Sequence, residues 1–283
     1  MRIISAPSEL KDTITSYKKN DKTIGFVPTM GALHDGHLSL IKKSIDQNDC
    51  TVVSIFVNPL QFNNSSDLAK YPRVIEEDIK LLKSYDVNVV FTPSEDDLYP
   101  RQPMISINFG DLSKRLEGEF RKGHFEGVGV IVSKLLHLTS PDFAYFGLKD
   151  LQQYILIRTL CEELDFPTNV VGVETVREDS GLALSSRNRR LSESGLNDAS
   201  IIYQELKKIK EGIELGTSLK DLLSEARASY KSSPGFELEY LEAVNPINLQ
   251  PVEEYSSLNE LAVCVAGYVE GVRLIDNLYL RLK

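Results

Sequence analysis

The chain has 283 residues and a formal net charge of −9 at pH 7, with 42% hydrophobic and 26% charged residues. This acidic balance argues against a broad nucleic-acid surface, because such surfaces depend on many lysine and arginine contacts to phosphates. The length predicts one large or two medium domains, and the composition excludes fibrous, low-complexity and repeat architectures.

The first part of the chain alternates short β-rich runs with longer helical patterns. Strands are predicted at 23–27, 51–57, 87–91, 142–146 and 168–173, and helices at 38–45, 74–85, 128–138 and 150–164. This alternation predicts βαβ units on a parallel sheet, and the apolar character of most strand positions indicates helices on both faces. We therefore expect an α/β fold, with a Rossmann-like doubly wound parallel sheet over residues 1–176.

The pattern changes after about residue 176. Two amphipathic helices are predicted at 198–214 and 219–230, followed by strands at 238–244, 261–266 and 272–280. Helices followed by consecutive strands indicate a smaller C-terminal α+β domain, which we expect over residues 177–283. The stretch 177–190 is expected to join the two domains, and clefts between domains commonly bind ligands.

The cysteines Cys50, Cys161 and Cys264 lie far apart in apolar runs and form no CxxC pair. We expect buried free thiols, because metal and redox sites need clustered ligands. No apolar run approaches the about 18 residues of a membrane helix, and the N-terminus lacks the pattern of a secretion signal. The sequence therefore predicts a cytoplasmic protein with no membrane and no nucleic-acid partner.

The stretch GFVPTMGALHDGHLSLI, residues 25–41, places two of the four histidines where a strand passes into a helix. The strand is predicted to stop at Pro28 and the helix to begin near His37. Ligands sit outside the carboxyl ends of strands in an open α/β sheet, and a helix N-terminus attracts phosphate. His34 and His37 can donate hydrogen bonds to a phosphate, while Gly36 lets the backbone come close. The alternative is that these histidines only cap the helix or pack in the loop.

Six ordered motifs resemble those of one family. They are VPTMGALHDGHLSLI, SIFVNPLQF, YPR, EGEFRKGHFEGV, DFAYFGLKDLQQ and REDSGLALSSRN, and they span most of residues 25–190. The chain is similar to the pantothenate synthetase, or pantoate–β-alanine ligase, family of the HxGH nucleotidyltransferase superfamily. The resemblance implies ATP-dependent condensation of (R)-pantoate with β-alanine to pantothenate, AMP and diphosphate through a pantoyl adenylate. It also implies Mg²⁺ as a cofactor and a homodimer.

The resemblance assigns roles to individual residues. His37 is expected to be the main catalytic donor, with His34 beside it on the phosphates. Gln61 and Gln153 are expected to bind pantoate, and Gln61 also β-alanine, because neutral amides offer both donors and acceptors. The expected ATP-binding residues are Met30, Gly31, Ala32, Leu33, His34, Asp35, Gly36, His37, Gly147, Leu148, Lys149, Asp150, Val176, Leu184, Ser185, Ser186 and Arg187.

Charged residues in the later motifs suit a triphosphate. Lys149 follows a strand run, so its ammonium can reach phosphate oxygens, and the planar guanidinium of Arg187 can bind two oxygens at once. Asp150 is one candidate ligand of Mg²⁺, and no cluster of His, Cys and Asp indicates a structural metal. His124 belongs either to a mobile cover over the adenylate or to an ordinary loop, whereas His137 is expected in the packed core.

Two other functions stay open on the residues alone. One is a different HxGH nucleotidyltransferase that transfers an adenylyl or cytidylyl group to another small substrate. The other is a nucleotide-binding regulatory module with an inactive turn, against which the intact histidines, Lys149 and Arg187 argue. Pyrophosphate exchange into ATP with pantoate alone distinguishes the ligase from the first, and turnover with all three substrates distinguishes it from the second.

Overall fold

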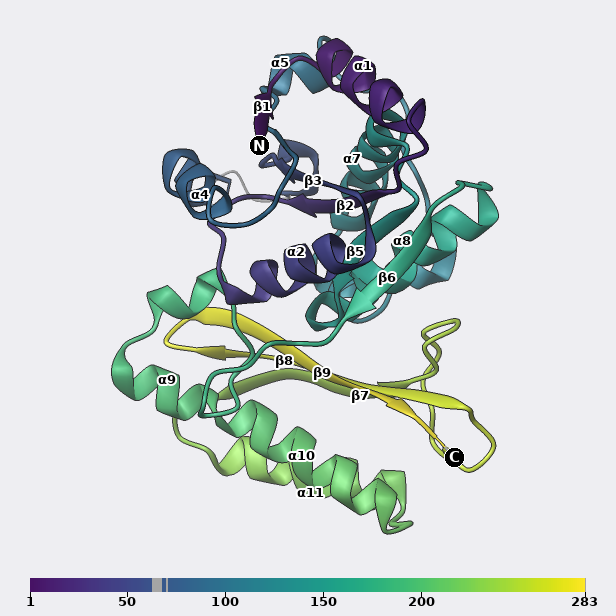
Figure 1. The fold of residues 1–283 in the computed structure, drawn as a ribbon. Helices are drawn as coiled ribbons and strands as arrows, with labels where there is room; N and C mark the ends of the chain where they lie inside the picture. Colours follow the sequence, from purple (N-terminus) through teal and green to yellow (C-terminus); the bar gives the residue numbers. More distant parts are fainter. Residues whose placement is uncertain (63–67, 70, 283) are drawn as a thin grey trace. The chain divides into compact units, whose positions relative to one another are not determined.

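The computed structural model describes residues 1–62, 68–69 and 71–282 of the chain (Figure 1). Its contacts group these residues into two compact units. The first unit comprises Met1–Gly147 and Gln152–Val173, and the second comprises Leu148–Leu151 and the chain from Glu174 onward. No helix within the described ranges is both long and apolar enough to cross a membrane. The sequence-based division between residues 176 and 177 stays a prediction.

The first unit contains a sheet of six parallel strands in the order β1-β4-β3-β2-β5-β6. The strands are β1 (Arg2–Ile4), β2 (Ile24–Thr29), β3 (Cys50–Ile55), β4 (Val89–Phe91), β5 (Phe143–Gly147) and β6 (Asn169–Val173). The chain moves outward from β2 through β3 to β4 and then returns to the other side of β2 to form β5. Strand order therefore reverses between β2 and β5, and open α/β sheets bind ligands at such points.

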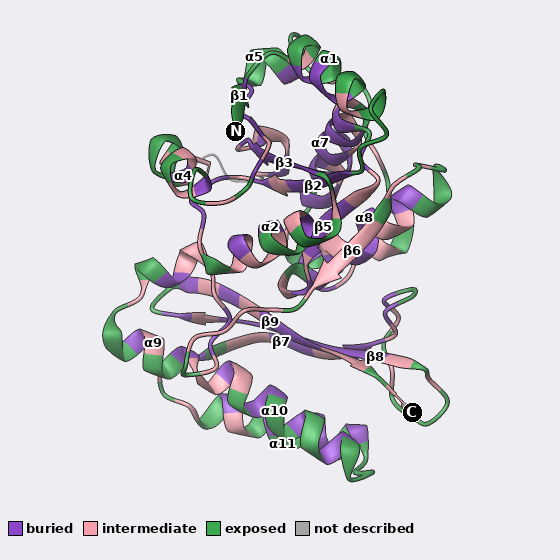
Figure 2. Ribbon diagram, in the orientation of Figure 1, coloured by how far each residue is buried: buried purple, intermediate pink, exposed green. Residues whose placement is uncertain are grey.

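Helices cover both faces of this sheet. They are α1 (Pro7–Lys18), α2 (Asp35–Gln47), α4 (Ile75–Leu82), α5 (Glu95–Leu98), α6 (Glu117–Phe120), α7 (His124–Thr139) and α8 (Leu151–Glu163), with the 3-10 turns η1 (Pro59–Gln61) and η2 (Gly110–Ser113) between them. The 3-10 turn η3 (Leu148–Asp150) follows β5 and belongs to the second unit. Phe26 of β2 enters the core that α1 and α7 cover, whereas its neighbour Val27 enters the core that α2 covers. Figure 2 shows the central strands buried, as expected of strands packed on both faces. The predicted Rossmann-like doubly wound sheet is confirmed.

Local features of the first unit differ from the sequence expectations. The structure adds β1 and α1, and β2 continues through Pro28 to Thr29. Helix α2 begins at Asp35, before the predicted start near His37, because the His34 side chain accepts a backbone N–H as a capping residue does. The core position expected for His137 is wrong. This side chain is exposed, because the residues just before it already take the buried side of α7.

The second unit contains an antiparallel sheet covered by helices. Its elements are the 3-10 turn η4 (Ser186–Arg190), helices α9 (Glu193–Ala199), α10 (Ile201–Glu214) and α11 (Leu219–Ser232), and strands β7 (Glu237–Val244), β8 (Glu260–Val269) and β9 (Val272–Arg281). The strand order is β7-β8-β9, and α10 and α11 pack on each other and against this sheet. Leu206, Tyr230 and Val263 lie in the resulting core. The predicted smaller α+β fold is confirmed.

Candidate active site

The turn that follows β2, residues 30–37, is called the histidine turn below. It contains two backbone positions in the left-handed region, Gly31 with φ of 81° and Ala32 with φ of 51°. A side chain at Gly31 would place its Cβ 2.9 Å from a carboxylate oxygen of Asp78, so glycine is required there. The Asp78 carboxylate, which belongs to α4, accepts the N–H of Ala32 at 2.9 Å and of Leu33 at 2.8 Å. A residue outside the motif therefore holds the turn.

The two predicted histidines lie together at the N-terminus of α2. Nδ1 of His34 accepts the N–H of Gly36 at 3.1 Å, and Nδ1 of His37 accepts the N–H of His34 at 3.3 Å. The ring centroids are 4.1 Å apart. Because both Nδ1 atoms accept hydrogen bonds, each neutral ring carries its proton on Nε2. The histidines therefore do cap the helix, and the same contacts leave Nε2–H as the donor atom of each ring.

Gln61 lies in η1, shortly after β3, and is 7% exposed. Its Oε1 accepts from Nδ2 of Asn58 at 3.1 Å, and its Nε2 donates to Sδ of Met30 at 3.0 Å. Nδ2 of Asn58 also donates to the carbonyl of Gly127, and its Oδ1 accepts the hydroxyl of Tyr99 at 2.9 Å. These contacts fix the direction of both amides. The NH₂ group of Gln61 consequently faces the histidine turn, where Met30 lies.

The N-terminus of α7 packs closely on η1. A Cβ at Gly127 would lie 2.3 Å from the carbonyl oxygen of Leu60, so this approach requires glycine. His124, the first residue of α7, is 5% exposed, and its Nδ1 lies 2.9 Å from the carbonyl oxygen of Gln61 and 3.1 Å from a guanidinium nitrogen of Arg121. His124 therefore supports the backbone at Gln61. The ordinary-loop alternative is wrong, because His124 is buried and begins a helix, whereas a role in a mobile cover stays a prediction.

Gln153, the second predicted pantoate-binding glutamine, lies half-buried in the first turn of α8. Its neighbour Gln152 is 4% exposed, and Nε2 of Gln152 donates to the carbonyls of Leu112 and Arg115 at 2.8 and 2.9 Å. The two adjacent glutamines therefore differ in their surroundings. Gln152 anchors the segment around η2, whereas Gln153 stays the candidate for substrate binding.

In the second unit, Lys149, Ser185 and Arg187 line one small pocket together with Arg273 and Asp276 of β9. The Lys149 side chain is 16% exposed, and Oγ of Ser185 accepts the backbone N–H of Arg187 at 3.3 Å. An ammonium, a guanidinium and a hydroxyl on one pocket are the groups that bind phosphate oxygens. Predicted residues from distant parts of the sequence are thus brought together within this unit.

Strand β9 also holds the 3-10 turn η3, called the lysine turn below. Nδ2 of Asn277, a residue that is 7% exposed, donates to the carbonyls of Leu148 and Lys149, both at 2.9 Å. The adjacent Asp276 forms a bidentate ion pair with Arg177 at 2.6 and 3.0 Å. Two consecutive buried polar residues of one strand therefore position two of the segments predicted to bind ATP.

The other predicted ATP-binding residues occupy turns and the ends of elements. The carbonyl of Val176 accepts the N–H of Leu184 at 3.0 Å, which closes a hairpin before η4. Ser186 is the first residue of η4, and Gly147 is the last residue of β5. The Asp150 side chain is 56% exposed, with Oδ1 3.9 Å from the ammonium of the residue before it.

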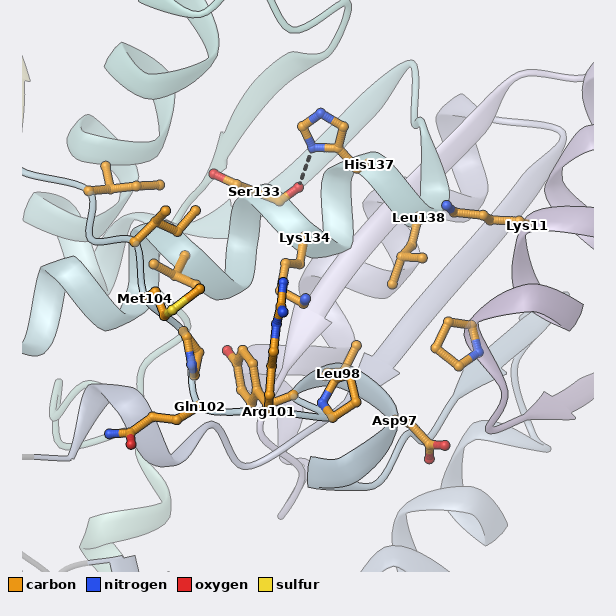
Figure 3. Close-up of a pocket in the computed structure, with 17 residues that line it drawn as sticks. Lys11, Asp97, Leu98, Arg101, Gln102, Met104, Ser133, Lys134, His137 and Leu138 are labelled. Atoms are coloured by element: carbon orange, nitrogen blue, oxygen red, sulfur yellow. Dashed lines mark hydrogen bonds between the residues drawn. The ribbon is translucent and has the colours of Figure 1, made fainter.

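A larger hollow of about 660 Å³ lies elsewhere in the first unit (Figure 3). It is bordered by α1, α5, α7 and the chain around residues 99–107, and Arg101 and Lys134 extend into it. All of the predicted site residues are described by the structure, and none of them lines this hollow. The hollow is therefore separate from the site predicted from the sequence.

A family model described as pantoate-beta-alanine ligase matches residues 2–279. The chain belongs to the pantoate–β-alanine ligase family. The pantothenate synthetase of Cytophaga hutchinsonii is 44% identical to it over 280 residues, which cover 99% of both chains. That of Leptospira interrogans is 45% identical over 285 residues, covering 99% of this chain and 98% of the relative.

Solved structures of the ligase family resemble the whole chain. The pantothenate synthetase of Thermus thermophilus matches with a TM-score of 0.92 and 39% identity, covering 98% of this chain and 99% of its own. The pantoate–β-alanine ligase of Francisella tularensis, described as complexed with beta-gamma ATP and β-alanine, matches with a TM-score of 0.80 and 38% identity, covering 98% and 97%. Both units therefore belong to the fold of this ligase family.

The residues that sequence reasoning missed in this ligase are those that hold its turns. Asp78 and Asn277 lie outside the motifs that carry the family resemblance. A sequence signal exists for each. Asp78 falls between apolar residues at the helical spacing of a buried stripe, and Asn277 follows Asp276 between the apolar pairs Leu274–Ile275 and Leu278–Tyr279 of β9. Buried polar residues of this kind require specific partners.

Proposed function

We propose that the chain joins (R)-pantoate to β-alanine, using ATP and forming pantothenate, AMP and diphosphate. The family match over residues 2–279 and the relatives named pantothenate synthetase support an ATP-dependent ligase of pantothenate biosynthesis. The observation that carries the chemistry is the histidine pair at the N-terminus of α2, after the central strand β2.

The reaction proceeds in two steps. A carboxylate is a poor acyl donor, so one pantoate carboxylate oxygen first attacks the α-phosphorus of ATP and diphosphate leaves. The product is a mixed anhydride, pantoyl adenylate. The amine of β-alanine then attacks the acyl carbon, the carbon–oxygen bond to AMP breaks, and the amine loses a proton to give the amide. An amine is a competent nucleophile for such an activated acid.

His37 and His34 act on the phosphates in the first step. Each ring carries an Nε2–H donor, fixed in its tautomer by the backbone contacts at Nδ1. These donors stabilise the negative charge that develops on oxygens around the α-phosphorus, and the positive end of the α2 dipole adds to the same effect. The positions are set before substrate binds, so little reorganisation accompanies the reaction.

Gln61 and Gln153 bind pantoate, and Gln61 also contacts β-alanine. The Gln61 NH₂ group donates to a thioether sulfur in the structure, which is a weak acceptor that a substrate oxygen readily replaces. A neutral amide holds the acid without pairing with its charge. The attacking oxygen therefore stays more electron-rich than it would beside an arginine.

The proposed ATP-binding residues are found in each unit taken by itself. The histidine turn supplies backbone groups and imidazoles, and Lys149, Ser185 and Arg187 supply positive charge and a hydroxyl for the phosphates. Val176, Leu184 and Ser186 contact the remainder of the nucleotide. This division predicts that variants in either unit weaken ATP binding.

The residues of the site would hold magnesium together with ATP. Within the described residues, no group of three or more His, Cys, Asp or Glu side chains is arranged to hold a metal. Magnesium that accompanies a nucleotide is held mainly by phosphate oxygens and water, so a single carboxylate is sufficient. Asp150, beside Lys149 and 56% exposed, would supply that carboxylate. The ion would screen the charge of the phosphates that leave as diphosphate.

The protein acts as a cytoplasmic homodimer. Met104 and Ile105 of the first unit are 83% and 76% exposed and lie next to each other in a segment without regular secondary structure. Exposed apolar side chains lose contact with water when a partner covers them, so we place the subunit contact at these two residues. Sedimentation analysis of the wild type and of Ile105→Glu tests the dimer: a monomeric wild type, or a variant that dimerises equally well, contradicts this surface.

The decisive experiment is pyrophosphate exchange into ATP. Because the adenylate forms before the amine reacts, the protein should exchange labelled pyrophosphate into ATP with pantoate and Mg²⁺ alone. Omitting pantoate should abolish exchange, and adding β-alanine should yield pantothenate and AMP. Exchange that is independent of pantoate, or a requirement for β-alanine before any exchange occurs, contradicts the proposed sequence of steps.

A further inference from the structure

Asp78 is a buried carboxylate whose two oxygens are both used by the backbone of another segment. It is 3% exposed, and it accepts from Ala32 and Leu33 at 2.9 and 2.8 Å. Removing a carboxylate from water is costly, so a buried one is kept only where strong hydrogen bonds replace its hydration. The placement therefore indicates a specific task at the histidine turn.

The histidine turn needs such support because its backbone is strained. Ala32 adopts a φ of 51°, a region that residues with a side chain occupy only at an energetic cost. Thr29 gives a second support, since its Oγ1 accepts the N–H of Gly31 at 3.2 Å and donates to the carbonyl of Ser54 at 2.7 Å. The turn is thus fixed to both β3 and α4.

The position of this turn determines where the imidazoles lie. Leu33, which donates to Asp78, directly precedes His34, the N-cap of α2. The backbone N–H of His34 in turn holds Nδ1 of His37 at 3.3 Å. A displacement of the peptide at residue 33 therefore moves the cap and both rings together.

We propose that Asp78 is a positioning residue for catalysis, which sets the Nε2–H groups of His34 and His37 against the reacting phosphate. Asp78 acts through the backbone and the histidines and does not touch substrate. This inference rests on the proposed role of the histidines in adenylate formation. Misplacing a reacting group by about 1 Å can cost on the order of 100-fold in rate.

The test is Asp78→Asn, which keeps the size of the side chain. One oxygen becomes an NH₂ group that faces a backbone N–H, so one hydrogen bond is lost and two donors meet. The rate of pantoate-dependent pyrophosphate exchange should fall about 10- to 100-fold. The KM for pantoate should stay within about threefold, because Asn58 and Tyr99 hold Gln61 independently of Asp78.

A matched control separates the hydrogen bonds from the charge. Glu76 lies on the same helix two residues earlier and is exposed, so Glu76→Gln removes one negative charge and leaves the turn intact. Its exchange rate should equal that of the wild type. An equal loss in both variants would attribute the effect to charge and overturn the positioning role.

NMR spectroscopy reports the positions of the histidine rings independently of enzyme activity. The chain has only four histidines, so ring Cε1–Hε1 NMR signals are few and assignable by His→Ala variants. In ligand-free Asp78→Asn, the signals of His34 and His37 should move, while that of exposed His137 stays in place. Unchanged signals for the pair, together with wild-type exchange, overturn the inference.

The outcomes also separate this inference from the proposed function. If His37→Ala keeps full exchange, the histidine role fails and the Asp78 role with it. If His37→Ala is inactive and folded Asp78→Asn behaves as the wild type, only the Asp78 role fails. Should Asp78→Asn not fold, Asp78→Glu carries the test, because it retains a carboxylate one methylene further out. Slower exchange with moved histidine signals supports the inference, and wild-type exchange overturns it.

Discussion

The histidine turn and the lysine turn follow two neighbouring strands of one sheet, β2 and β5, but they are held by opposite chemistry. The histidine turn presents backbone N–H groups to a carboxylate, that of Asp78. The lysine turn presents backbone carbonyls to an amide NH₂ group, that of Asn277. In each case one buried side chain satisfies two backbone groups at once.

The difference follows from what each turn leaves unpaired. A tight turn after a strand cannot pair all of its N–H and C=O groups within itself, and buried backbone groups need partners. An unpaired N–H group needs a hydrogen-bond acceptor such as a carboxylate. An unpaired carbonyl needs a hydrogen-bond donor such as an amide NH₂ group. The residues proposed to act on substrate thus lie in the motifs, whereas Asp78 and Asn277, which hold the backbone of the two turns, lie in other elements.

Removing the active group of the histidine turn should have the largest effect. We expect His37→Ala to slow pantoate-dependent pyrophosphate exchange by about 10²- to 10⁴-fold, since a positioned proton donor contributes on that order. The fold should survive, because the ring is not part of a core cluster. His137→Ala, which alters an exposed histidine of the same unit, is the control and should match the wild type. If His37→Ala exchanges pyrophosphate at nearly the wild-type rate, the proposed role of His37 in adenylate formation is wrong.

Reversing the chemistry at the lysine turn should have the next largest effect. Asn277→Asp keeps the side chain's shape but directs carboxylate oxygens at the carbonyls of Leu148 and Lys149. Two hydrogen bonds are lost and a negatively charged oxygen faces the negative ends of two carbonyl dipoles, so kcat/KM for ATP should fall about 10- to 100-fold. Steady-state kinetics at varied ATP measure this.

The control for that variant has the same change of charge in the same unit. Asn248 is exposed, and its Oδ1 accepts the N–H of Gln250 at 3.0 Å, an acceptor role that aspartate keeps. Asn248→Asp should therefore leave the kinetics with ATP unchanged. If Asn277→Asp is equally harmless, the lysine turn does not depend on the hydrogen bonds from Asn277. The two turns then do not share the same kind of support.

The sequence allowed much of the fold and the chemistry to be predicted. Alternating apolar runs and helical spacing indicate the parallel sheet, because strands buried on both faces must be apolar at most positions. The short edge strand β1 has only one buried residue among three, so no pattern reveals it. The start of α2 was misplaced because histidine is not a usual capping residue, and only the geometry of His34 shows that it acts as one.

The sequence marks Asp78 and Asn277 as buried polar residues, but it does not show which turns they support. Asp78 reaches the histidine turn from 45 positions away in sequence, and Asn277 reaches the lysine turn from 128. Such contacts depend on tertiary packing, which no local pattern contains. His137 is the opposite case. Its apolar neighbours in the sequence predict a buried side chain, but the packing of α7 leaves it exposed.

A smaller effect is expected from the residue that orients Gln61. Tyr99→Phe removes the hydroxyl that donates to Oδ1 of Asn58 at 2.9 Å. Burial raises the pKa of the Tyr99 hydroxyl above its ordinary value, so it stays a donor at any assay pH. Asn58 keeps its contacts to Gly127 and Leu60, so its amide is loosened but not released.

The KM for pantoate in Tyr99→Phe should rise about 3- to 10-fold, consistent with the loss of one hydrogen bond, while kcat changes less. Initial rates at varied pantoate measure the change. Tyr85→Phe, a half-buried tyrosine of the same unit, is the control. A lower kcat at unchanged KM would mean that Tyr99 supports adenylate formation, as the histidine turn does, and not the binding of pantoate.

The smallest effect at neutral pH should come from the thiols, which lie outside both turns. Burial raises the pKa of Cys50 to about 12 and that of Cys161 to about 11. Because these values exceed the about 8.5 of an unfolded thiol, the two groups favour the folded state fully below about pH 8.5, and that contribution is lost as pH rises toward 11 and 12.

The midpoint of urea unfolding should therefore be level between about pH 7 and 8 and fall above about pH 9, less steeply in Cys50→Ala. At pH 7.5 a thiol reagent should react slowly with the folded chain and leave pyrophosphate exchange unchanged, since all three cysteines are buried and none lies in either turn. If rapid modification of a cysteine stops exchange, that cysteine lies close to the reacting groups, and the two turns alone do not account for the site.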